Sequence, residues 1–110
     1  MYHGDGAIVP ILPDLIAMGV EVINPVQADA AGMEPERLKE DFGGRLSFHG
    51  GIDIVHTLPA GTPAEVRAEV AERRRTLGAG GGYIMASCHH IQAGTPLANI
   101  LAMYDPSARA

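Results

Sequence analysis

Four short apolar segments alternate with four segments of helical pattern, and this alternation limits the fold more than any other feature. The apolar segments are bounded by glycine or proline and read MYHG, VEVINP, LSFHG and GYIMAS. Three of them are too uniformly apolar for strands with one solvated face, so we expect buried parallel strands. A repeated strand–helix order predicts an α/β fold with right-handed crossovers.

The helix predicted over residues 62–78 carries both a start and a stop signal. Thr62 and Glu65 fit a capping box, and Gly78 suits the C-cap. We expect one apolar stripe along this helix, formed by Val66, Val70 and Leu77. The basic run Arg73–Arg75 is expected to be a solvated helix face near the negative end of the helix dipole.

Three further helices are predicted. The sequence Gly94-Thr95-Pro96 repeats the start chemistry before a helix whose apolar face would hold Leu97, Ile100 and Leu101. A helix near the start of the chain follows the 3.6-residue period and ends at Gly19. A shorter one runs from about Pro35 to Phe42.

Polar residues and glycine follow every predicted strand, in the segments GDG, PVQADAAG, GGIDIVHTLPAG and SCHHIQAG. The segments before strands are short and glycine-rich, such as GAGGG. Ligand sites of α/β proteins form at the carboxyl ends of parallel strands. Because every histidine lies at or just past such an end, we place the functional site there.

The composition indicates one globular domain with little affinity for nucleic acid or membrane. The chain has 110 residues, is 46% hydrophobic and carries a formal charge of -5, which leaves no broad basic surface for a phosphate backbone. No apolar run approaches the length of a membrane helix. The single cysteine, Cys88, excludes an intramolecular disulfide and fits a reducing compartment. We therefore expect a cytoplasmic protein.

His3 and Asp5 are the first candidates for chemistry. They are two residues apart on an extended segment, so both side chains point to the same face. Imidazole with carboxylate suits either a zinc ion or an acid–base pair. Alternatively, Asp5 caps the following helix and His3 only lines the fold.

Side chains at the ends of the second and third strands are candidates for substrate binding. Asn24 and Gln27 offer amide groups to a polar ligand. His49 precedes two glycines that allow close approach of a ligand, although a hydrogen-bonded core histidine explains it equally well. Asp53 follows the same turn, where a cap or a turn hydrogen bond is the competing explanation.

Several longer stretches carry a resemblance to a known family: HGDG, INPVQ, LKEDFGGRLSFHGGID, LPAGTPAEV and GGGYIMASCHHIQAGTPLANILAMY. Together they resemble the C-terminal part of the uroporphyrinogen decarboxylase family, which includes cobalamin-dependent methyltransferases. Family members are (β/α)8 barrels of about 250 residues or more. The resemblance implies that residues 1–104 form the last four βα units, half of a TIM barrel, and that 105–110 form a frayed tail.

The decarboxylase branch of the family implies a carboxy-lyase that acts on a tetrapyrrole in porphyrin biosynthesis and needs no cofactor. In that branch a histidine in the turn after the last strand takes part in the substrate pocket, and His89 matches it. We take His89 and Asp5 as the catalytic candidates, with His90 structural or exposed. The family's principal carboxylate and its substrate-binding arginine lie in the N-terminal half, so the lone chain is expected to be incomplete.

The methyltransferase branch implies a different site. Its members hold zinc with a His-x-Cys pair at the first of these strands and a further cysteine after the last, which match His3, Asp5 and His89. Harder ligands thus replace both thiolates, and Cys88 lies one residue out of register. The alternative function is zinc-dependent methyl transfer between a corrinoid and a thiol.

A half-barrel also implies association. Its two edge strands lack a partner on one side, and a second copy would cover them. We therefore expect a homodimer or a larger homo-oligomer. An inactive fragment that only self-associates is the third alternative.

Overall fold

The computed structural model describes residues 1–105 and shows one parallel sheet of four strands in the order β1-β2-β3-β4. The strands are β1 (Tyr2–His3), β2 (Val22–Val26), β3 (Ser47–Ile52) and β4 (Tyr83–Ser87). All three neighbouring pairs are parallel. This confirms the α/β prediction, and the architecture is that of half a TIM-barrel-like fold. The tail predicted at 105–110 lies, apart from Asp105, outside the described residues.

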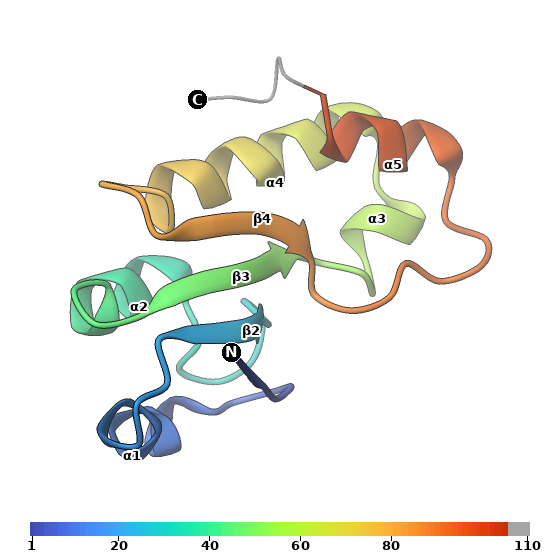
Figure 1. Cartoon of the computed structure of the whole chain (residues 1–110). Helices are drawn as coiled ribbons and strands as arrows, with labels where there is room; N and C mark the ends of the chain where they lie inside the picture. Colours follow the sequence, from blue (N-terminus) through green and yellow to red (C-terminus); the bar gives the residue numbers. More distant parts are fainter. Residues whose placement is uncertain (106–110) are drawn as a thin grey trace.

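The helices connect the strands in chain order. They are η1 (Val9–Ile11), α1 (Leu12–Ala17), α2 (Pro35–Phe42), α3 (Thr57–Ala60), α4 (Pro63–Thr76) and α5 (Leu97–Met103). The strand arrows point the same way, and α3 and the loop after β4 lie beyond their tips (Figure 1). Within residues 1–105, no helix is long and apolar enough to cross a membrane.

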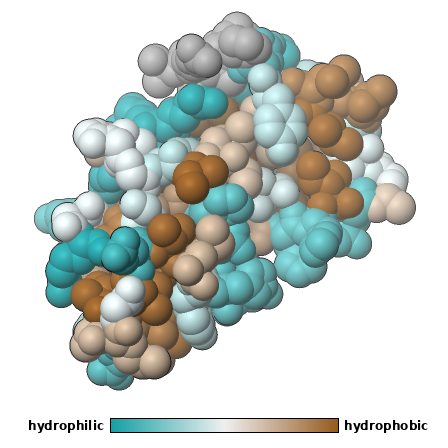
Figure 2. Space-filling view, viewed as in Figure 1, coloured by the Kyte–Doolittle hydropathy of each residue, from teal (hydrophilic) through white to brown (hydrophobic). Residues whose placement is uncertain are grey.

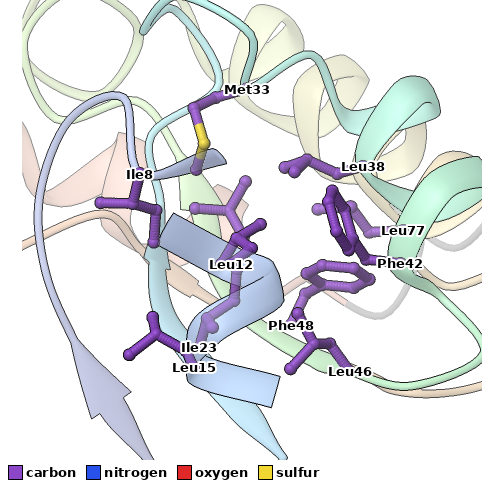
Figure 3. Close-up of a cluster of buried hydrophobic side chains, with 11 residues drawn as sticks. Ile8, Leu12, Leu15, Ile23, Met33, Leu38, Phe42, Leu46, Phe48 and Leu77 are labelled. Carbon is purple, nitrogen blue, oxygen red and sulfur yellow. The ribbon is translucent and has the colours of Figure 1, made fainter. Parts of the chain in front are cut away.

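The larger core cluster lies between the sheet and the helices η1, α1 and α2. It joins Ile23 of β2 and Phe48 of β3 to side chains from these helices and the loops beside them (Figure 3). Its other members are Ile8, Leu12, Leu15, Val26, Met33, Leu38, Phe42, Leu46 and Leu77. Burial of this continuous apolar surface is the main term that holds the sheet to its helices.

The second cluster lies under α4, and its members differ from the apolar face predicted for α5. Val66 and Val70 of α4 pack with Ile52, Leu58, Ala102 and Met103. All three residues of the stripe predicted on this helix are buried, although Leu77 follows the end of α4 and packs in the larger cluster. In contrast, α5 buries Ala102 and Met103, leaves Ile100 half-buried, and leaves Leu97 68% and Leu101 63% exposed. The prediction of the apolar face of α5 was therefore wrong. The helix is turned so that Asn99 is buried, and the side-chain amide of Asn99 donates to the carbonyls of Leu58 and Gly61.

Strand alternation decides which side chains reach the opposite face of the sheet. Ile23 and Phe48 are paired in register and fully buried in the core. The next residues, Asn24 and His49, therefore point away from the helices. His3 pairs in register with Asn24, so three predicted site residues share one face of the sheet. Only His3 ends its strand: Asn24 and His49 lie in the middle of β2 and β3, not at the strand ends where the sequence predicted them.

Candidate functional site

Asn24 lies between two histidines and contacts both. Its Oδ1 is 2.8 Å from Nδ1 of His3, and its Nδ2 contacts Nδ1 of His49. Each side chain comes from a different strand, so the contacts depend on the parallel register of β1, β2 and β3. We call His3, Asn24 and His49 the histidine bridge.

His89 and Asp5 lie around His3 at the same edge of the sheet. Nε2 of His3 is 3.9 Å from Oδ2 of Asp5, and both side chains are more than half exposed. The imidazole ring of His89 lies with its centroid 6.5 Å from that of His3. The two catalytic candidates and one end of the histidine bridge are therefore within reach of a single ligand.

The predicted zinc ligands do not fit a metal ion as they are placed. Among residues 1–105, no three His, Cys, Asp or Glu side chains come close enough together to hold one. A ring separation of 6.5 Å between His3 and His89 exceeds what two nitrogens about 2 Å from one zinc ion allow without movement.

Two cavities meet at His89 and Cys88. The larger, about 490 Å³, is lined by Asp5, Gln27 and Asp53 together with residues of α4 and the loop after β2. The smaller, about 340 Å³, contains the histidine bridge. All the candidate site residues therefore line one of two adjoining hollows, and His89 lines both.

Glu69 and Arg73 of α4 also line the larger cavity, and sequence reasoning missed them. Both side chains are only 16% exposed and lie 3.8 Å apart. Arg73 Nε donates to the carbonyl of Gly51 at 2.9 Å, so the expectation that it lies on a solvated face was wrong. The available signal was the spacing of four between a Glu and an Arg on the helix face that packs on the sheet.

Asp53 closes the turn after β3. Its Oδ1 accepts from the backbone N–H of Val55 at 2.8 Å, and its Oδ2 is 3.1 Å from Nδ1 of His56. Burial alone would raise the pKa of Asp53, but the hydrogen bonds from Val55 and His56 outweigh it and hold this pKa below 3.8. The turn hydrogen bond named as the alternative role is thus present, and substrate binding stays a prediction.

Cys88 and Gln27 both have structural partners. The thiol of Cys88 is buried and lies 3.0 Å from the carbonyl of Val26. Gln27 Oε1 accepts from the backbone N–H of Gly6 at 3.0 Å, which fixes the loop after β1. Gln27 also lines the larger cavity, and its binding of substrate stays a prediction.

The fold and the side chains at its carboxyl edge together define one half of a TIM-barrel-like α/β protein. The family model for uroporphyrinogen decarboxylase matches residues 1–109, so the chain belongs to the uroporphyrinogen decarboxylase family. No curated protein matches the chain, and no solved structure matches it.

Proposed function

We propose that this chain supplies half of a carboxy-lyase site that acts on a tetrapyrrole with acetate side chains. The observation that carries the proposal is the gathering of His3, Asp5 and His89 at one edge of the sheet, beside a cavity of about 490 Å³. Family membership over residues 1–109 supports the choice of reaction. The remaining half of the site comes from a second half-barrel.

The reaction exchanges a carbon–carbon bond for a carbon–hydrogen bond. A pyrrole ring carbon accepts a proton, and the ring becomes cationic. The bond between the acetate methylene and its carboxylate then breaks, its electron pair moves toward the ring, and carbon dioxide leaves. The methylene carbon takes up a proton while the ring carbon gives its proton back, so one proton is consumed overall and no cofactor is needed.

The two catalytic candidates and the acidic side chains of the larger cavity each have a role in this scheme. His89 is exposed at the mouth of both cavities and transfers the proton to the pyrrole. The carboxylate of Asp5 accepts a pyrrole N–H and stabilises the positive ring. In the larger cavity Glu69 is paired with Arg73, but Asp5 and Asp53 leave an excess of negative charge there, so acetate groups bind on the side of the imidazoles.

The test is complementation. The chain is co-expressed with the N-terminal half of a uroporphyrinogen decarboxylase barrel, and carbon dioxide release from uroporphyrinogen is measured for the pair and for each half alone. We expect release from the pair only. His89→Gln in the pair should lower the rate by about 100-fold or more, the usual contribution of a general acid. His90→Gln is the comparison variant: the ring of His90 lies 4.9 Å from that of His89 and lines the smaller cavity but not the larger one, so this variant should lower the rate far less than His89→Gln.

The other outcomes distinguish the alternatives. Halves that associate without releasing carbon dioxide would contradict the proposal and favour an inactive, self-associating fragment. Near-stoichiometric zinc that is bound by the chain and lost in His89→Gln would favour methyl transfer instead. Metal analysis on untagged protein measures this zinc content independently of the activity assay.

A further inference from the structure

The side-chain amide of Asn24 lies between two histidines and presents its oxygen to one ring and its nitrogen to the other. Nδ1 of His3 faces Oδ1 of the amide at 2.8 Å, and Nδ1 of His49 faces its Nδ2. The oxygen of an asparagine amide only accepts hydrogen bonds, and the nitrogen only donates them. The two imidazoles therefore meet opposite ends of one dipole through the same ring atom.

These contacts restrict the protons on both neutral rings. An Nδ1 that faces an amide oxygen must carry a hydrogen, whereas an Nδ1 that faces an amide NH2 must offer a lone pair. The hydrogen bond made by one ring nitrogen fixes the state of the other. His3 consequently carries its neutral-state hydrogen on Nδ1, and His49 carries it on Nε2. Turning the amide over would exchange the two assignments but would still leave the rings in opposite tautomers.

We propose that Asn24 is a positioning residue that holds His3 and His49 in opposite tautomers and so gives them different roles at the site. Nε2 of His3 is left as a proton acceptor, and it is the atom that lies 3.9 Å from Asp5. Nε2 of His49 is left as a donor of a hydrogen bond.

The proposal rests on the proposed function in one respect: the acceptor at His3 Nε2 and the donor at His49 Nε2 are the complementary groups that a proton-transfer site needs. Asn24 itself has no amide atom free of these two rings in this arrangement. Each amide atom keeps one further N–H or lone pair beyond these contacts, so direct binding of substrate by Asn24 stays a prediction beside its action through the histidines.

The test reads the tautomers directly. Uniformly ¹⁵N-labelled full-length chain is studied by long-range ¹H–¹⁵N correlation spectra at about pH 8.5, where an ordinary imidazole is neutral. His3→Gln and His49→Gln assign the two rings. We expect the pattern of an Nδ1–H ring for His3 and of an Nε2–H ring for His49. Two rings of the same tautomer, or the reverse assignment, would overturn the proposal.

Substitution of Asn24 tests its effect on the two tautomers more directly. Asn24→Asp has nearly the same shape but offers an acceptor at both ends, so His49 should move its hydrogen from Nε2 to Nδ1 while His3 keeps its pattern. Gln27→Glu adds the same charge at the same edge but contacts Gly6 rather than either ring, so it should leave both patterns unchanged. An unchanged His49 in Asn24→Asp, with the fold retained, would refute the role of Asn24. Because no substrate is involved, this result is independent of the activity test above.

Discussion

At the scale of single residues, the thiol of Cys88 is held in its unreactive form. Burial raises the pKa of Cys88 from 9.0 to about 11, and the sulfur lies 3.0 Å from the carbonyl of Val26. The thiolate is the reactive species, so a rise of this size lowers its population at neutral pH by about 100-fold. Buried sulfur at the wall of both cavities thus serves packing rather than chemistry.

We therefore predict that the native chain reacts slowly with iodoacetamide at pH 7.5. The rate should be at least about 100-fold below that of the same chain unfolded in urea, and it should rise about tenfold per pH unit until the pH approaches 11. Mass spectrometry of quenched samples measures both rates. Native modification as fast as that of the unfolded chain would contradict the assignment of Cys88 as a buried, protonated thiol.

The residue types of the candidate site were predictable, but their contacts were not. His3, Asp5 and His89 follow apolar strands in the sequence, and a carboxyl-edge site follows from that order. The bridge through Asn24 depends instead on the register between strands that are separated by about 20 residues, which no local pattern encodes. Arg73 was misplaced because a charge run says nothing about which of its members turns toward the sheet.

At the scale of elements, α4 has the best-defined start. Thr62 Oγ1 accepts from the backbone N–H of Glu65, and the Glu65 side chain accepts from the backbone N–H of Thr62, both at 3.2 Å. A reciprocal pair of this kind satisfies two backbone donors that a helix start otherwise leaves unpaired. The capping box predicted from the sequence is present in full.

We predict that Thr62→Ala lowers the free energy of unfolding by about 1 kcal/mol, the usual cost of a lost N-cap. Urea denaturation followed by circular dichroism measures the change. Thr95→Ala is the matched control, because Pro96 rather than Thr95 occupies the N-cap of α5 and no side chain caps that helix. Equal losses in the two variants would show that the capping box of α4 adds nothing.

The starts of α4 and α5, and the short helix α3, show where local sequence patterns fail to predict secondary structure. Two identical Gly-Thr-Pro triplets stand at the starts of α4 and α5, but Pro63 is the first residue of α4 whereas Pro96 is the N-cap of α5, so only Thr62 caps a helix. The backbone N–H of Thr95 instead donates to the carbonyl of Gln92 in a turn before α5. The four-residue α3 was not expected, since its turn is held by tertiary contacts: Thr57 donates to Glu69 of α4, and Leu58 is buried in the second core cluster. Contacts between elements thus decide where α3 forms, and the turn after Gln92 decides how the chain enters α5.

At the scale of the whole molecule, the sheet has two open edges. β1 pairs only with β2, and β4 pairs only with β3, so one side of each edge strand has no strand beside it within residues 1–105. Hydrophobic surface also gathers over α5 and over α1 (Figure 2). On β4, Ile84 is 51% exposed. An open edge that carries an apolar side chain favours pairing with another chain, and β4, with five residues, is the longer of the two edges.

We predict that the isolated chain forms a homodimer or a larger homo-oligomer in which a second copy covers these edges. Ile84→Lys places a charge on the edge strand and removes apolar contact, so it should weaken association by about tenfold or more, on the scale of one buried aliphatic side chain. Sedimentation velocity across the micromolar range measures the oligomeric state of the wild-type chain and the dissociation constant of each variant. Ala68→Lys adds the same charge at an exposed position of α4, whose buried residues Val66 and Val70 pack in the second core cluster, and should leave the dissociation constant unchanged. A wild-type chain that sediments as a monomer throughout this range would refute the prediction, and equal effects of the two substitutions would move the interface away from β4.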